Sequence, residues 1–313
     1  MLSRIADSMF WLNRYMERSD GLLRSVKTHY ILLLDKDVNR HLSWRPILEI
    51  FTNCNEKQLL ALQGNSDASM QLLLLDNRNQ NSLKTMITKS RENARGMQDH
   101  ITKEVWEQVN LIYHTLNQTD SNLQLKGFEV MKTIDRLTEE STLYNGVTDT
   151  TMSRGMGWNF MRLGKFIERC LLTIEMTDIY FKLIDYRLDD EKDILQWRPL
   201  LLSLSGYELH LKTYRSNNHN RNTLHQVLFN EYFTRSVLYN LLRIDKYFKE
   251  VIRDNNGKEK ENLTKCLGRL VSKVQYTDFE SLNELILQEF LSDIRKDLVE
   301  FSKQLAQYFF SYS

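Results

Sequence analysis

Apolar residues recur along this chain at every third or fourth position, which is the period of an amphipathic α-helix. Projected at the helical angle, the opening segment gathers one apolar stripe of Ile5, Met9, Leu12, Met16 and Leu23. The same period predicts later helices at residues 81–99, 103–118, 121–144, 233–254, 259–275 and 281–311. Thr102 is expected to cap the helix starting at 103, and Ser281 with Glu284 has capping-box spacing for the last one. The pattern therefore predicts an all-α fold.

Two Trp-Arg-Pro motifs contain both prolines of the chain, Pro46 and Pro199. Proline is favoured at the first helical position and pushes its predecessor out of the helical region. Each motif is therefore expected to start a helix. Trp44 and Trp197 are expected to pack back on the first turn, in a purely architectural role.

Short segments of the first half return, in the same order, in the second half. With their offsets, they are Ser3-Arg4 and Ser153-Arg154 at 150, WLNRYMER (11–18) and RLGKFIER (162–169) at 151, WRPIL (44–48) and WRPLL (197–201) at 153, and NSL (81–83) and RSV (235–237) at 154. Each half then reads as a long opening helix, a Trp-Arg-Pro helix, a short apolar segment and two or three long helices. We expect two tandem, internally duplicated helical bundles, residues 1–147 and 148–313, packed with approximate two-fold pseudosymmetry.

Composition narrows the class of protein. Only 2 prolines and 11 glycines occur in 313 residues, which disfavours an all-β sandwich or a glycine-loop nucleotide fold. The 42 Lys and Arg residues balance 41 Asp and Glu residues, so no nucleic acid partner is expected. The apolar runs are too short for a membrane span, and no export signal is evident.

Cysteine and metal-ligand patterns are weak. Cys54, Cys170 and Cys266 lie far apart, which suggests neither disulfides nor a zinc site and fits a cytoplasmic protein. No Glu-x-x-His or His-Glu-x-x-His motif occurs, so neither a metal nor a cofactor is expected. Asp189, Asp190 and Asp193 do match the Asp-Asp-x-x-Asp spacing of magnesium-dependent prenyl-diphosphate enzymes, which stays open as a remote alternative.

The two repeated Glu-Arg pairs are the main candidates for chemistry. Alone, the face of Glu17 resembles a solvated helix face. The face of Glu168 is different, because Met161, Gly164 and Leu171 share it, and a carboxylate there must pair or change its protonation. Arg169, Arg154 or an arginine from another helix is a natural partner for Glu168. A structural ion pair and a ligand or catalytic site both remain open.

A second polar cluster occupies residues 91–95. Arg91 and Arg95 lie four residues apart on one helix face, with Glu92 and Asn93 between them and Trp106 on the next helix. Two guanidinium groups in this register could hold a carboxylate or a phosphate. A solvated helix face is the alternative.

These segments together resemble the bacterial alpha-E domain family over nearly the whole chain. The resemblance is carried by MLSRIADS (1–8) with residues 11–18, by MSR (152–154) with GWNF (157–160) and LGKFIER (163–169), and by RENAR (91–95) with the later Trp106-Glu107. The family's Glu-Arg signature maps onto Glu17-Arg18 and Glu168-Arg169. The departures are mild: Lys165 stands where arginine is usual and Cys170 where alanine is usual.

The resemblance implies an all-helical protein encoded beside circularly permuted ATP-grasp ligases and transglutaminase-like proteases, in a system that makes or trims peptide-like amides. Two functions remain open. The chain could be a partner that docks the ligase or presents a peptide-like substrate, or an enzyme that uses Glu17 or Glu168 as acid or base. The candidate substrate-binding residues are Arg4, Arg18, Arg91, Glu92, Asn93, Arg95, Arg154 and Arg169. The sequence shows no nucleophile–base–orienter set, which favours the partner.

Overall fold

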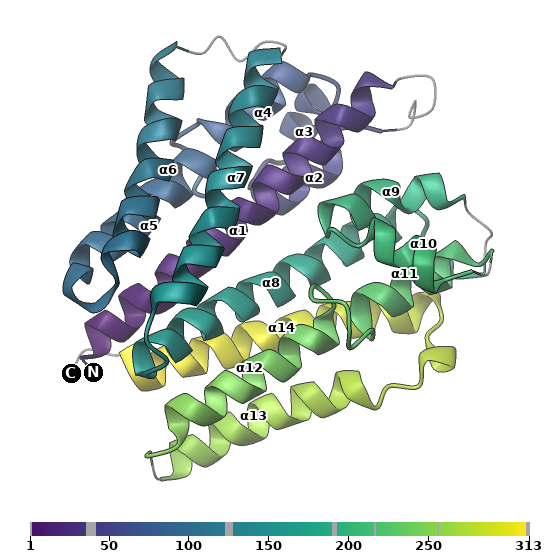
Figure 1. Ribbon diagram of the computed structural model, residues 1–313. Helices are drawn as coiled ribbons and strands as arrows, with labels where there is room; N and C mark the ends of the chain where they lie inside the picture. Colours follow the sequence, from purple (N-terminus) through teal and green to yellow (C-terminus); the bar gives the residue numbers. More distant parts are fainter. Residues whose placement is uncertain are drawn as a thin grey trace. The chain divides into compact units, whose positions relative to one another are not determined.

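The computed structural model describes residues 2–35, 42–122, 128–189, 193–215, 217–255 and 257–310. Over these ranges the chain forms fourteen α-helices and two short 3₁₀ helices, and no strand (Figure 1). The all-α fold is therefore confirmed.

The helices fall into two series of the same order. The first series is α1 (Ser3–Leu34), α2 (Arg45–Phe51), α3 (Glu56–Leu62), α4 (Ser66–Leu74), α5 (Leu83–Gly96), α6 (Lys103–Asn122) and α7 (Phe128–Thr151). The second is α8 (Met156–Lys182), α9 (Ile194–Ser203), α10 (Tyr207–Thr213), α11 (His219–Leu228), α12 (Val237–Ile252), α13 (Lys258–Gln275) and α14 (Glu284–Phe310). The 3₁₀ helices Gln98–His100 and Phe279–Ser281 precede α6 and α14. In each series a long helix comes first, three short helices follow, and three longer helices end the series.

Contacts divide the chain into two compact units, one of Met1–Phe10 with Gly155–Ser313 and one of Trp11–Arg154. The start of α1 groups with the later residues, where the Phe10 ring lies 5.3 Å from that of Phe310. The expected boundary between residues 147 and 148 separates the two sequence repeats and does not coincide with these contact units. It stays a prediction.

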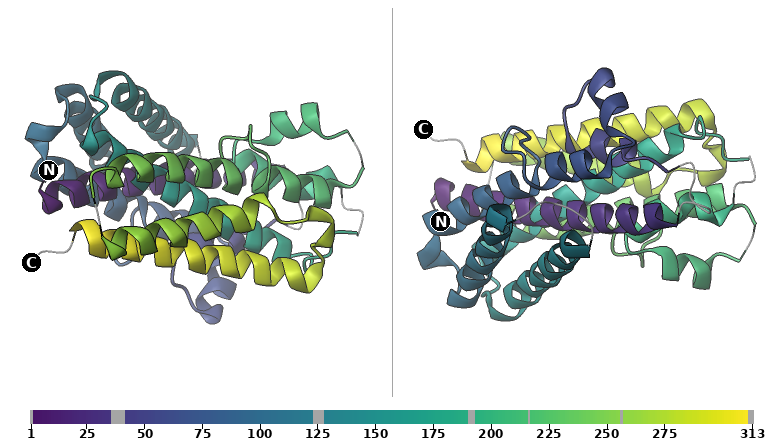
Figure 2. Two further views of the ribbon diagram at one scale, coloured as in Figure 1. Left: turned by 90° about the horizontal axis from the view of Figure 1, so that it is seen from below. Right: turned by 90° about the horizontal axis from the view of Figure 1, so that it is seen from above.

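The unit Gly155–Ser313 is built on a ring of four helices. Helix α12 packs on α8 and α13, and α14 packs on α13 and α8. Figure 2 shows α12, α13 and α14 running lengthwise beside one another. Phe248 and Phe301 join α12 to α14 inside the ring, with their centroids 5.3 Å apart. The short helices α9 and α11 pack on α8.

The unit Trp11–Arg154 contains most of α1 together with α5, α6 and α7. Helix α6 packs on α5 and α7. An ion pair of 2.7 Å between Lys27 and Asp135 links α1 to α7. Lys89 of α5 lies 5.6 Å from the ring of Tyr15 on α1, which links these two helices. The short helices α2, α3 and α4 pack on one another, and α4 packs on α5.

Two expectations about helix starts were wrong. Pro46 does lie in the first turn of α2, but Pro199 lies inside α9, because the Asp193 side chain accepts from the Leu195 N–H and starts the helix earlier. At the last helix, Ser281 donates to the Asp278 carbonyl instead of capping α14. Asn283 takes that role and accepts from the Ile286 N–H at 3.3 Å.

Candidate functional site

The two Trp-Arg-Pro tryptophans anchor the short helices of each series. Trp44 and Trp197 are each only 1% exposed. The Trp44 indole donates to the Ser66 hydroxyl at the start of α4, and the Trp197 indole donates to Asn220 near the start of α11, both at 2.9 Å. Both tryptophans are buried in the packing of short helices, as an architectural role requires.

Both glutamates of the Glu-Arg pairs are buried. Glu17 on α1 and Glu168 on α8 are each 3% exposed. The expected solvated face around Glu17 was wrong, because Phe10, Asn13 and Asp20 on that face are buried as well. A helical projection separates apolar from polar faces, so it cannot show that a polar face is buried as well. Neither glutamate lacks an interaction partner.

The arginines that follow the two glutamates are half-buried and contact aromatic rings. Arg18 donates to the Ile50 carbonyl at 3.1 Å and lies 5.4 Å from the ring of Phe51. These contacts fix the end of α2 against α1. Arg169 lies 5.7 Å from the ring of Phe166, one turn earlier on α8.

The arginines of the two Ser-Arg matches lie nearer the solvent. Arg4 and Arg154 are exposed. Arg154 donates to the Asp149 carbonyl and forms an ion pair of 3.5 Å with the Asp149 carboxylate. Arg154 therefore has a local partner at the end of α7.

The cluster at residues 91–95 is divided by the fold. Arg91 donates to Asn110 on α6 at 2.7 Å and lies 5.9 Å from the ring of Trp106 and 4.6 Å from that of Tyr113. The contacts of Arg91 thus join α5 to α6. Glu92 and Arg95 are exposed, and the Asn93 amide donates to the Lys89 carbonyl of its own helix.

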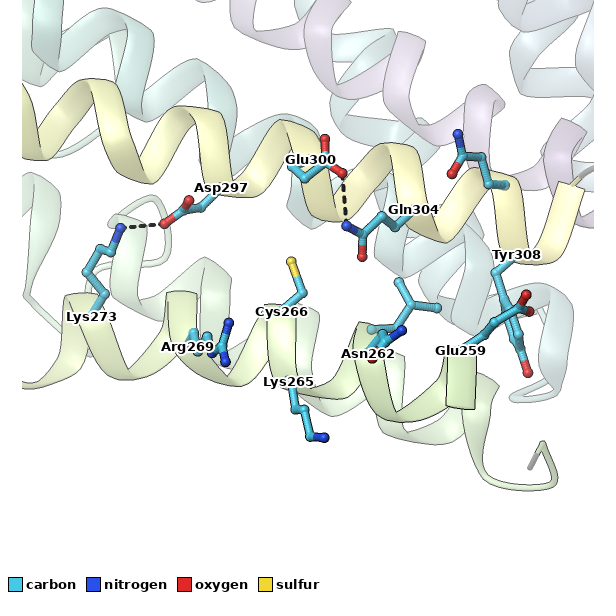
Figure 3. Close-up of a pocket in the computed structure, with 12 residues that line it drawn as sticks. Glu259, Asn262, Lys265, Cys266, Arg269, Lys273, Asp297, Glu300, Gln304 and Tyr308 are labelled. Carbon is cyan, nitrogen blue, oxygen red and sulfur yellow. Dashed lines mark hydrogen bonds and ion pairs between the residues drawn. The ribbon is translucent and has the colours of Figure 1, made fainter. Parts of the chain in front are cut away.

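A cavity with a volume of about 830 Å³ lies between α13 and α14. Figure 3 shows Cys266 pointing toward α14 and Lys265 pointing away from it. Burial, reinforced by Asp297 and Glu300, raises the pKa of the Cys266 thiol, which keeps it protonated and weakens it as a nucleophile. The remaining polar groups are largely paired, as in the 2.5 Å contact between Lys273 and Asp297.

A second cavity of about 550 Å³ lies beside α3 and α4. It is lined by side-chain amides together with the ion pair between Arg78 and Asp76, which are 2.8 Å apart. None of the four Glu-Arg residues lines either of these two cavities.

The acidic motif at 189–193 serves other interactions. The Asp189 carboxylate lies 3.1 Å from Arg221, and Asp193 caps α9. Asp190 lies outside the described residues. Within the described ranges, no group of three or more His, Cys, Asp and Glu side chains is arranged to hold a metal ion. The two described carboxylates thus give the magnesium alternative no support.

Sequence reasoning missed a cluster of cations and aromatic rings where α8 meets α12, which we call the α8–α12 seam. It consists of Trp158, Arg162, Phe166, Tyr239, Arg243, Lys246 and Tyr247. Arg162 lies 4.9 Å from the rings of both Trp158 and Phe166. The four-residue spacing of aromatic and basic residues on both helices was the signal that could have revealed it.

None of the described helices combines the length and the apolar character that a membrane span requires.

The chain is thus an all-helical protein with two Glu-Arg pairs on long helices, and in each pair the glutamate is buried and the arginine half-buried. Comparison with known families matches residues 1–310 to Alpha-E, described as a predicted alpha-helical domain with a conserved ER motif. The chain belongs to this family. Neither the curated proteins nor the solved structures include a significant match to it.

Proposed function

We propose that this chain is a non-catalytic partner in an ATP-grasp-dependent system that makes or modifies peptide-like amides. One observation carries the proposal: Glu17 and Glu168 are each only 3% exposed. A general acid or base must come within hydrogen-bond distance of the proton that it transfers. Carboxylates buried to this extent are better suited to hold helices in register than to meet a peptide.

The ionisable groups outside the Glu-Arg pairs also support a partner. The pKa of the Cys170 thiol is raised by complete burial, and that of Cys266 by burial and two acidic neighbours. Burial lowers the pKa of His29 to about 4, and its Nε2 lies 2.5 Å from the Ser43 carbonyl. These groups are held in their neutral forms by packing, as structural residues are.

The proposed partner is a circularly permuted ATP-grasp ligase, with a transglutaminase-like protease as a second member of the system. Docking of the ligase, or presentation of its peptide-like substrate, would use the half-buried arginines of the two pairs, Arg18 and Arg169, with the buried glutamates supporting them from within. Half-buried arginines suit such a face, because stacking on Phe51 and Phe166 orients them before a partner arrives. A cytoplasmic location belongs to the same proposal.

We also propose that the two helix series arose by duplication and are related by an approximate two-fold axis. The common order of long and short helices supports this, as do the two indole hydrogen bonds. Ser82 and Ser236, which belong to the weakest sequence match, both cap the fifth helix of their series. An experimental structure that placed Glu17 and Glu168 at unrelated positions of their bundles would contradict the duplication.

Binding of the ligase tests the partner function directly. The purified chain should bind a circularly permuted ATP-grasp ligase from the same organism with a dissociation constant of roughly micromolar order, measured by calorimetry. The variant Glu168→Gln should weaken binding about tenfold. It should lower the free energy of unfolding by no more than about 2 kcal/mol, because the amide keeps the volume and most hydrogen bonds.

Glu289→Gln is the matched control, because Glu289 is exposed on α14. It should change neither binding nor stability. If Glu168→Gln lowers the free energy of unfolding by more than about 2 kcal/mol while the folded fraction binds the ligase as the wild type does, Glu168 is only structural. If the purified chain alone modifies a peptide and Glu168→Gln abolishes that activity without unfolding, the chain is an enzyme with Glu168 as acid or base.

A further inference from the structure

The α8–α12 seam is a row of aromatic rings bordered by cations. The rings of Phe166 and Tyr247 lie 5.7 Å apart and nearly parallel, at 10°. The ring of Tyr239 continues the row 6.5 Å from Phe166. Phe166 is buried, whereas Tyr239 and Tyr247 are half-buried at the surface. The row is therefore anchored in the core at Phe166 and reaches the surface at the two tyrosines.

Three basic side chains lie over the rings of this row. Besides its contacts with Trp158 and Phe166, Arg162 lies 5.7 Å from the ring of Tyr247. Lys246 also lies 5.7 Å from Tyr247, and Arg243 lies 4.8 Å from Tyr239. Stacking on a ring fixes a guanidinium plane while leaving its N–H donors available at the edge. The seam thus presents three oriented positive charges.

None of these three cations forms an ion pair within the described part of the chain. The acidic residues of α12 are engaged elsewhere: Asp245 lies 2.5 Å from Lys249, and Glu250 pairs with Arg253. The Arg162 Nε is buried and has no hydrogen-bond partner among the described residues. The Arg162 guanidinium is therefore not fully satisfied by the described part of the chain, and a carboxylate bound to it would gain charge-assisted hydrogen bonds.

The arrangement favours several carboxylates spaced along one extended ligand. Arg162 and Lys246 share the Tyr247 ring, whereas Arg243 lies at the Tyr239 ring, so the three charges are distributed along the row. Guanidinium groups bind carboxylates through paired in-plane hydrogen bonds, and aromatic edges accommodate aliphatic side-chain stems. A nucleic acid needs a broader basic surface, which a chain with a net charge of +1 does not supply.

We propose that the α8–α12 seam is a binding surface for an acidic peptide segment, held by Arg162, Arg243 and Lys246. The proposal stands apart from the ligase partnership, since it rests on charge and geometry at the seam alone. The corresponding helices of the first series provide a natural comparison. There Lys89 stacks on Tyr15 and donates to Gln80 at 2.8 Å, and an acidic residue, Glu92, lies one turn further on.

The test measures binding of a fluorescent short poly-glutamate peptide to the full chain by anisotropy. We expect a dissociation constant of roughly micromolar order, weakened at least tenfold by Arg162→Gln, Arg243→Gln and Lys246→Gln together. Raising the salt from about 50 mM to about 200 mM should also weaken binding. Exposed Lys246 supplies a mild single variant, Lys246→Glu, which should weaken binding severalfold without affecting folding.

The matched control removes three exposed cations that lie outside α8 and α12: Lys57→Gln, Lys296→Gln and Lys303→Gln together. It should bind the peptide as the wild type does. Poly-glutamine, pyrophosphate and oligothymidine are the competing probes. The proposal fails if the folded wild type does not bind poly-glutamate, if the control loses as much affinity as the seam variant, or if pyrophosphate or oligothymidine binds more tightly than the peptide.

Discussion

Helices α5 and α12 begin alike and then diverge in charge. Ser82 and Ser236 cap them with nearly the same backbone angles, φ −66° and ψ 150° against φ −66° and ψ 155°. Seven residues after each cap stands a cation stacked on a ring, Lys89 or Arg243. Ten residues after each cap the first series has Glu92 and the second has a lysine. The two helices thus share the same kind of cap but differ in charge at this outer position.

The same contrast holds at the Trp-Arg-Pro helices. The motif is repeated, but its arginine has two acidic partners in the first series and stacks on a tyrosine in the second. Repetition of the helix order therefore does not imply repetition of surface chemistry. Paired substitutions at corresponding positions measure how far the likeness of the two series extends.

The largest effect is expected at the buried tryptophans. Trp44→Ala and Trp197→Ala should each lower the free energy of unfolding by about 3–5 kcal/mol, because a large cavity forms. The phenylalanine variants should separate the two series. Trp197→Phe removes the donor to fully buried Asn220 and should cost about 1–3 kcal/mol more than the change of shape alone.

Trp44→Phe should cost less than Trp197→Phe, because its acceptor Ser66 is only half-buried and can turn to water. Urea denaturation of the four variants and the wild type measures these differences. Equal costs for the two phenylalanine variants would mean that the indole hydrogen bonds are equivalent after all.

A pH-dependent effect is expected from His29, which is 1% exposed. Burial lowers its pKa from 6.5 to about 4 in the folded protein. The unfolded chain therefore binds a proton first as the pH falls. The stability associated with neutral His29 is fully present above pH 6.5 and declines by about 3 kcal/mol as the pH falls to about 4.

His29→Gln should flatten this part of the pH profile, measured by urea denaturation between pH 7 and pH 4. At the corresponding offset of 151 the second series has Tyr180, whose pKa is raised by burial and which stays neutral throughout this window. Tyr180→Phe should therefore leave the slope unchanged. If both variants retained the wild-type slope, the acid sensitivity would arise elsewhere.

The smallest effect is expected at the Trp-Arg-Pro arginines. Arg45 lies 2.7 Å from Glu49 and 2.8 Å from Glu56, but its side chain is 31% exposed and Glu56 is 62% exposed. Arg45→Gln should cost about 0.5–1 kcal/mol, less at high salt. Arg198→Gln should show a smaller cost without salt dependence, since Arg198 lies 5.9 Å from the Tyr207 ring instead. Thermal melts at low and high salt measure both costs. A larger loss of stability for Arg198→Gln than for Arg45→Gln would contradict the expected order.

Local pattern predicted the helices and part of their starts. The predicted segments 103–118 and 259–275 correspond to α6 and α13, because the apolar period continues through them. Pro46 lies in the first turn of α2 as expected. Pro199 does not, because a competing cap at Asp193 lies outside the motif. A motif predicts a helix start only where no nearby residue offers a stronger cap.

The sequence by itself determined the all-α class, membership of the Alpha-E family and the positions of both Glu-Arg pairs, since these depend on local period and residue identity. Only the tertiary structure decided that Glu17 is buried as deeply as Glu168. The tertiary structure alone also gathered Arg162 and Arg243 on one row of rings from helices far apart in the chain. Burial and charge clustering depend on which helix faces meet, and the period of a single helix carries no information about its neighbours.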